Sequence, residues 1–131
     1  MFLDANVFIN YYVSKSSDGI ACASLMRRIS SGEQKACTSP LVIDEVIYYL
    51  IGKRGLPFAQ KALQNILINQ NIQMLPIDHH VLSRLPEYLG QGMAPRDAMH
   101  AATMRVYSIS TICSFDRAFD KVKGIRRQEP K

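Results

Sequence analysis

The stretch FLDANVFIN, residues 2–10, sets the pattern for the whole chain. It is rich in Phe, Val and Ile, but Asp4 and Asn6 interrupt it. We predict a strand over Met1–Asp4, then a turn, and then a helix from about Val7. Asp4 would lie at the carboxyl end of a buried strand, where an unpaired carboxylate costs much free energy. This acid must therefore be paired, coordinated to an ion, or turned towards a cleft.

The rest of the chain repeats this alternation of a short apolar strand with one or two helices. Further strands are predicted at Lys35–Ser39, Ile72–Ile77, Ile109–Phe115 and, at an edge, Ile125–Gln128. Helices are predicted at Asp18–Ser31, Leu41–Gly52, Phe58–Asn69, His79–Leu89, Pro95–Tyr107 and Asp116–Val122. Such alternation is typical of a parallel sheet with helices on both faces and right-handed crossovers. We therefore expect an α/β fold whose functional residues lie outside the carboxyl ends of the strands.

Length and composition are those of an ordinary globular domain. The 131 residues are 47% hydrophobic and 21% charged, which argues against disorder, a collagen-like repeat and a coiled coil. We expect residues 1–131 to form one domain. The longest charge-free apolar stretch, Val46–Gly52, is too short to cross a bilayer, and the first residues lack the basic region of a secretory signal. Three cysteines without a CxxC pair are expected to be reduced thiols in a cytoplasmic protein.

The charge balance is mildly basic. Sixteen Lys and Arg residues against eleven Asp and Glu residues give a net charge of +5. Five of the cations lie between Lys121 and Lys131, and a second basic set is spread over the first half of the chain. Such clusters are compatible with nucleic-acid binding, but they are equally typical of solvated helix ends, so both interpretations stay open.

Four acids occupy positions that composition does not explain. Asp4 and Asp116 follow predicted strands, Glu45 lies within an apolar helix, and Asp97 lies in the first turn of another. Asp97 and Asp116 could each simply cap a helix, and Glu45 could lie on an exposed stripe. In a parallel sheet, however, the carboxyl strand ends and the starts of the following helices share one edge, so all four acids can converge on one cleft.

Converging carboxylates repel each other unless a cation lies between them. Hard divalent cations such as Mg²⁺ or Mn²⁺ prefer oxygen ligands and are the natural counter-charge. Setting these four negative charges apart from the net +5 leaves +9 on the rest of the chain. A basic body around an acidic, metal-binding pocket suits a polyanionic substrate.

Four sequence blocks follow one another along the chain: FLDANVFIN, SPLVIDEVIYYL, RDAMHAATM and SFDRAF. Together, these blocks resemble the PIN-domain family, especially VapC-like toxins. The acids of the family motifs fall on Asp4, Glu45, Asp97 and Asp116. The polar residue that follows the first acid is Asn6, and the last block carries Ser114 two residues before its acid. The resemblance covers nearly the whole chain and implies a three-layer α/β/α fold around a mostly parallel sheet of four to five strands.

The same resemblance implies a metal-dependent ribonuclease. Mg²⁺ or Mn²⁺ held by three aspartates, Asp4, Asp97 and Asp116, would activate a water that hydrolyses an RNA phosphodiester. Glu45 would bind a second ion or orient the water, while Asn6 and Ser114 would hold the carboxylates or the waters of the ion. The partners implied are the RNA substrate, a small antitoxin protein and a second copy of the chain, and none of them is a membrane.

The sequence leaves open two rival functions and the question of whether two further residues contribute to the site. A phosphatase of the haloacid dehalogenase kind also has an acid after its first strand, but it needs a second Asp where this chain has Asn6. A catalytically silent PIN-like module would bind RNA or protein without cleaving, yet it has no physical need for four acids. His100 lies three residues after Asp97, and Asp120 lies one turn after Asp116, so either could contribute to the site.

Overall fold

The computed structural model describes residues 1–131 and contains a five-stranded, fully parallel sheet. The strands are β1 (Phe2–Leu3), β2 (Ala36–Thr38), β3 (Ile72–Met74), β4 (Thr111–Cys113) and β5 (Arg126–Gln128). Their order across the sheet is β3-β2-β1-β4-β5, and every neighbouring pair is parallel. The parallel sheet predicted from the alternation of elements is confirmed, with the last strand at an edge as expected.

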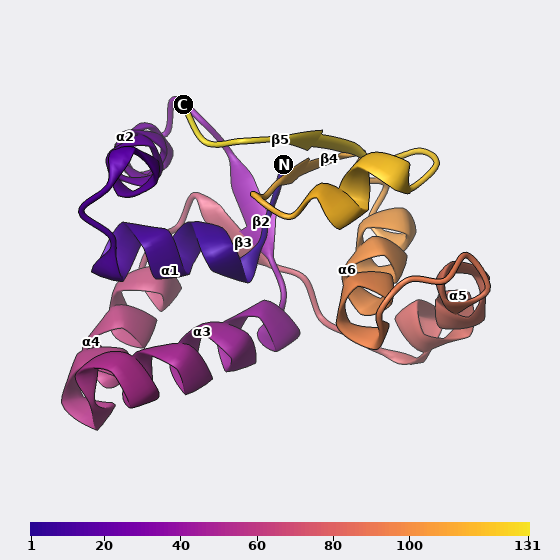
Figure 1. Cartoon of the computed structure of the whole chain (residues 1–131), viewed down its shortest axis with the longest axis horizontal. Coiled ribbons are helices and arrows are strands. Elements are labelled where there is room, and N and C mark those ends of the chain that lie inside the picture. The colour runs from indigo at the N-terminus through magenta and orange to yellow at the C-terminus, as the bar shows by residue number, and fades with distance from the viewer.

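Helices cover both faces of this sheet, as Figure 1 shows. They are α1 (Ala5–Val13), α2 (Ser17–Ser30), α3 (Pro40–Arg54), α4 (Leu56–Leu67), α5 (His79–Leu89), α6 (Pro95–Val106) and a 3₁₀ helix, η1 (Arg117–Lys121). Right-handed crossovers put α1 to α4 on one face, because these connections step from β1 to β2 to β3. The connection from β3 back to β4 runs the other way across the sheet, so α5 and α6 cover the opposite face. This is the expected three-layer α/β/α arrangement.

Five helix starts differ from the sequence predictions by one or two residues, and two of these differences have a local cause. The predicted turn before Val7 is absent, because α1 begins at Ala5 directly after β1, with Asp4 as its N-cap. The helix α2 begins at Ser17, one residue before the predicted start at Asp18, and its N-cap is Ser16. Gly19 explains the earlier start of α2: a Cβ at this position would lie 2.2 Å from the carbonyl oxygen of Ser14, so glycine allows the first turn of α2 to pack against the end of α1.

The core lies between the central strands and the helices on both faces. The side chains of β1 (Phe2 and Leu3) and Ile112 of β4 are fully buried. All three cysteines are buried and free, which confirms the expected thiols, and burial raises the pKa of Cys113 to about 12. None of the helices combines the length and the apolar character that crossing a membrane requires.

Candidate functional site

The chain leaves β1 and β4 in opposite directions, which opens a crevice at the carboxyl ends of these adjacent strands. The chain after β1 turns towards β2, and the chain after β4 turns towards β5. Such a point, where the strand order reverses, is where α/β proteins bind their ligands. Asp4 follows β1 and Asp116 follows β4, so the topology brings these two predicted site residues to the crevice.

Asp4 is held by three hydrogen bonds although its residue is only 7% exposed. Its Oδ1 accepts from the backbone N–H of Ala5 at 2.7 Å. Its Oδ2 accepts from Asn6 Nδ2 at 2.7 Å and from Ser114 Oγ at 2.5 Å. Burial raises the pKa of Asp4, and the hydrogen bond from Ser114 opposes this rise. The carboxylate is therefore oriented by its donors, but no cation pairs with it.

Asn6 and Ser114 join the ends of the two strands. Asn6 Nδ2 also donates to Ser114 Oγ at 3.0 Å, and Asn6 Oδ1 accepts from the backbone N–H of Phe115 at 3.3 Å. Ser114 Oγ in turn accepts from the backbone N–H of Asp116 at 2.9 Å. The two residues expected to support the acids therefore form one network that fixes the chain between β4 and η1.

Asp116 and Asp97 face this network from two different segments. Asp116 is exposed and caps η1, because its Oδ1 accepts from the backbone N–H of Ala118 at 2.8 Å. Asp97 lies half-buried in the first turn of α6. Burial raises the pKa of Asp97, and the negative charges of Asp116, Asp4 and Glu45 raise it further, while no hydrogen bond lowers it. The three other predicted acids thus lie close enough to Asp97 to act on its charge.

Glu45 reaches the same crevice from the second turn of α3, and His100 holds it there. Its Oε1 lies 3.0 Å from His100 Nε2, and its Oε2 lies 3.6 Å from Arg96 Nη1. His100 is 1% exposed, its ring lies 5.7 Å from the ring of Phe2, and its Nδ1 is buried without a partner. The contact with Glu45 is therefore the one hydrogen bond of this side chain, and His100 also lowers the pKa of Asp4 and Asp97 through its charge, against the larger effect of burial.

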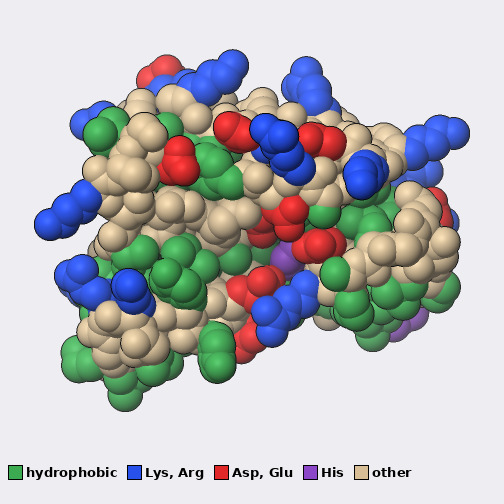
Figure 2. Space-filling model, in the orientation of Figure 1, with side chains coloured by type: hydrophobic (Ala, Val, Ile, Leu, Met, Phe, Trp, Pro, Cys, Tyr) green, Lys and Arg blue, Asp and Glu red, His purple; other side chains and the backbone are tan.

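The donor atoms suit a hard divalent cation. Figure 2 shows acidic side chains gathered in a hollow of the surface, with Lys and Arg side chains around it. No set of three or more His, Cys, Asp and Glu side chains is close enough to hold a metal ion as it stands. The carboxylate oxygens are nevertheless the ligand type that Mg²⁺ and Mn²⁺ prefer. Burial is the main cause that raises the pKa of both Asp4 and Asp97, and the charge of His100 only partly opposes the rise.

Asp120, which could have been a further ligand, is paired elsewhere. Arg127 contacts both of its carboxylate oxygens, at 2.8 Å from Nε and 3.3 Å from Nη2, and these hydrogen bonds lower the pKa of Asp120. Arg127 Nη1 also donates to the backbone carbonyl of Ser114 and to Glu129, both at 2.9 Å. Arg127 of β5 therefore ties down both ends of the segment that carries Asp116.

Replacing Arg127 is expected to loosen this segment. Arg127→Gln should lower the melting temperature more than Arg126→Gln does, because Arg126 makes a single side-chain hydrogen bond, to Thr111 at 3.2 Å. Thermal unfolding followed by circular dichroism at low and high salt measures the difference, which should shrink at high salt as the ion pairs are screened. Equal melting temperatures for the two variants would show that Arg127 does not anchor the segment.

Comparison with known proteins shows which family this chain resembles. The family model described as PIN domain matches residues 1–125. The chain is 27% identical over 131 residues to a VapC ribonuclease of Mycobacterium bovis and to the ribonuclease VapC13 of Mycobacterium tuberculosis, covering 97% of this chain and 98% of each relative. It is 25% identical over 135 residues to the ribonuclease VapC2 of Methanocaldococcus jannaschii, covering 93% of this chain and 88% of that relative.

Solved structures agree on the fold. The Mycobacterium tuberculosis toxin VapC20, described as cleaving the sarcin–ricin loop, superposes with a TM-score of 0.71 at 18% identity over 88% of both chains. VapBC2 of Rickettsia felis, solved with a DNA fragment from its promoter, superposes with a TM-score of 0.76 at 12% identity over 99% of this chain and 98% of that chain. With the family match over residues 1–125, these findings show that the chain belongs to the PIN domain family and is a VapC-like member of it.

Proposed function

We propose that this protein is a metal-dependent endoribonuclease that hydrolyses RNA phosphodiester bonds, and that it is the toxin of a toxin–antitoxin pair. One observation carries the proposal: half-buried Asp97 accepts no hydrogen bond, and its pKa is raised by burial and by three other carboxylates from separate segments. Keeping like charges together costs free energy, so such a cluster needs a function. The relatives named VapC ribonucleases support RNA as the substrate.

Asp4, Asp97 and Asp116 are the residues that we propose to hold Mg²⁺ or Mn²⁺, with Glu45 binding a second ion or orienting the attacking water. A bound divalent cation lowers the pKa of water and offsets negative charge on the phosphate. The protein's own contribution is orientation. Asn6 and Ser114 donate to Asp4, which keeps one carboxylate oxygen turned in a single direction.

Glu45 and Arg96 have separate tasks in this mechanism. His100 fixes one oxygen of Glu45 at 3.0 Å, so Glu45 stays in place when substrate enters. The Arg96 side chain is 64% exposed and lies 3.6 Å from the other oxygen. It is therefore free to move onto a phosphate oxygen of the RNA, because an exposed ion pair of this length holds it weakly. With water as nucleophile, no covalent intermediate with the protein forms.

The proposed partners follow from the same family. We propose a small antitoxin because one matching structure is a VapBC2 complex. We also propose that residues 1–131 act as one nuclease domain in the cytoplasm. A second copy of the chain is the proposed neighbour of α3 and the start of α4, where Tyr48, Ile51 and Leu56 are 82%, 42% and 53% exposed. Contiguous exposed apolar side chains of this size favour an interface.

The rival proposal is a silent PIN-like module that binds RNA or protein without cleaving. It predicts RNA binding with no new RNA ends. Four clustered acids argue against it, because a binding surface for a polyanion is weakened by carboxylates.

Sequencing of RNA ends distinguishes the two proposals. RNA incubated with wild-type protein and Mg²⁺ or Mn²⁺ should gain ends with 5′-phosphate and 3′-hydroxyl groups that are absent with Asp4→Asn. Asparagine has the size of aspartate, but its single carbonyl oxygen can keep either the hydrogen bond from Ala5 or those from Asn6 and Ser114. Circular dichroism therefore checks that the fold of the variant is intact. Identical ends with both proteins would reject a nuclease centred on Asp4, and RNA binding without new ends would favour the silent module.

A further inference from the structure

Two cavities lie next to each other on the side of the candidate site that faces β5. The smaller cavity, of about 270 Å³, lies between the α5–α6 loop and η1 and includes Asp97 and Lys121 in its lining. The larger cavity, of about 530 Å³, lies between α5, α6 and the chain before β5 and includes Arg105 and Lys123. Gln91 lines both cavities, so they adjoin each other at this residue, and we refer to the two together as the groove.

This groove connects the two edges of the sheet. Its start at Asp97 lies at the carboxyl edge, where the four acids meet. Its far end is lined by Ser110 and Gly124, which precede β4 and β5 and so lie at the amino edge. Both strands are only three residues long, about 10 Å at the usual rise of a strand. A few nucleotides of an extended strand would cover this distance.

Unpaired positive charge lines the groove. Arg105, Lys121 and Lys123 are all exposed, and none of them takes part in an ion pair, since the four ion pairs of the structure use Arg96, His100 and Arg127. The one acid in the larger cavity is Glu87. Cations without partners repel one another, so a run of them along a groove favours a polyanion.

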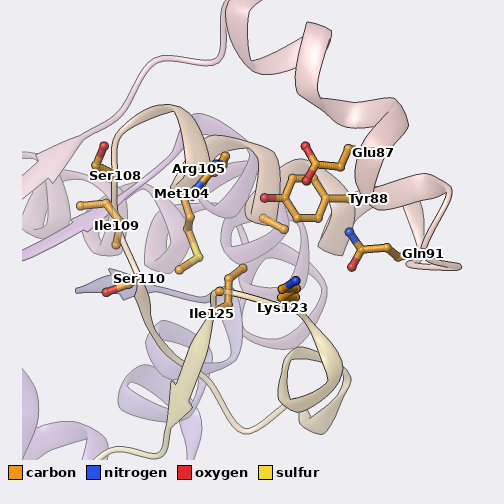
Figure 3. A pocket seen from close by; sticks show the side chains of 12 residues that line it. Glu87, Tyr88, Gln91, Met104, Arg105, Ser108, Ile109, Ser110, Lys123 and Ile125 are labelled. Carbon is orange, nitrogen blue, oxygen red and sulfur yellow. The ribbon is translucent and has the colours of Figure 1, made fainter.

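The walls between these cations suit nucleotides. Figure 3 shows Tyr88 of α5 and Gln91 of the α5–α6 loop extending into the larger cavity, with Ile125 and Lys123 across from them. Tyr88 is 4% exposed, so its ring forms part of the cavity wall, while the side-chain amide of exposed Gln91 takes part in none of the hydrogen bonds of the structure. A free side-chain amide beside cations can contact the sugar–phosphate backbone of a nucleic acid.

We propose that this basic groove, defined by Arg105, Lys121, Lys123, Tyr88 and Gln91, binds the RNA strand on one side of the cleaved phosphate. The inference rests on the proposed ribonuclease function and adds to it the path of the substrate. The cleaved phosphate lies at the four acids, and the flanking nucleotides follow the groove from Asp97 towards Ser110. Because the contacts are mostly with the backbone, they add affinity with little preference for sequence.

A pair of charge-matched double variants tests this path. Arg105→Gln with Lys123→Gln removes two charges from the groove, and Lys53→Gln with Lys61→Gln removes two exposed charges from α3 and α4, on the other face of the sheet. Binding of a labelled single-stranded RNA to the full-length protein is measured in EDTA over a range of salt concentrations. Each lost phosphate contact should reduce the slope of log K against log[salt] by about 0.7.

The groove double variant should therefore lose about 1.4 from the slope and about 25-fold in affinity at 0.1 M salt, while the control keeps the wild-type slope. If the groove double variant unfolds at a lower temperature than wild type, Lys123→Gln alone should still lose about 0.7. If the groove variants and the control have the same slope as a wild type that cleaves RNA, the proposed RNA path along the groove is rejected and the proposed nuclease function stands. A wild type that neither binds nor cleaves RNA would overturn both.

Discussion

Asp97→Asn is expected to lower RNA cleavage by at least about 10²-fold, because loss of a direct ligand should cost at least as much as loss of a group that orients a ligand. The substitution keeps the size of the side chain and removes one of the charges that would hold the cation. It breaks no hydrogen bond, since Asp97 makes none. The metal-free variant should be at least as stable as wild type, because burial and neighbouring acids already disfavour the charged form of Asp97.

Cleavage of a labelled RNA and growth after induced expression measure this effect together. Wild-type protein should arrest growth, and Asp97→Asn should not. Asp44→Asn is the matched control, because Asp44 is an exposed acid beside Glu45 on α3 and loses the same charge. Equal toxicity of wild type and Asp97→Asn would contradict a toxin that acts through this site.

Removal of divalent ions is expected to reduce cleavage to the background rate, and added Mg²⁺ or Mn²⁺ should restore it. The same ions should stabilise the fold. An ion present at 100 times its dissociation constant adds about 2.7 kcal/mol to the free energy of unfolding, which corresponds to several degrees in melting temperature for a chain of this length.

The stabilisation by divalent ions should grow with pH, because the pKa values of Asp4 and Asp97 are raised. Burial raises the pKa of Asp4 and of Asp97 above the usual 3.8. In the metal-free protein, the stability that these groups contribute is fully present below pH 3.8 and is lost as the pH rises through their raised values. A divalent cation replaces the lost protons, so the rise in melting temperature on adding Mn²⁺ should be small near pH 4 and larger at pH 7–8.

Melting curves with Mn²⁺ and with EDTA at pH 4, 5.5 and 7.5 test this coupling. Asp97→Asn again serves as the comparison, because it should lose most of the stabilisation at every pH. Cleavage that persists in EDTA would rule out metal catalysis, and an equal effect of Mn²⁺ on wild type and Asp97→Asn would place the ion elsewhere on the protein.

Much of the fold follows from local sequence signals. The alternation of short strand-like runs with helical patterns identifies all five strands, and the predicted starts of α5 at His79 and of α6 at Pro95 are confirmed. The start of α1 predicted near Val7 is wrong, because the sequence analysis treats Asp4 only as an acid at the end of a strand. The structure shows that it is also the N-cap of the next helix.

The sequence alone also singles out the four acids, because a carboxylate inside an apolar run or after a buried strand is costly wherever it occurs. Their approach to one another follows from the parallel topology, which places all carboxyl strand ends at one edge. Their roles as ligands remain predictions.

Only the tertiary structure decided which partner each remaining polar side chain meets. His100 lies on the same buried face of α6 as Ala101, and nothing local predicts that it contacts Glu45, 55 residues away. Asp120 looks like a ligand in sequence, yet β5 brings Arg127 against it. Hydrophobic periodicity is a property of a few consecutive residues, whereas a hydrogen bond between segments depends on the rotation and spacing of packed elements, which exist only once the whole chain has folded.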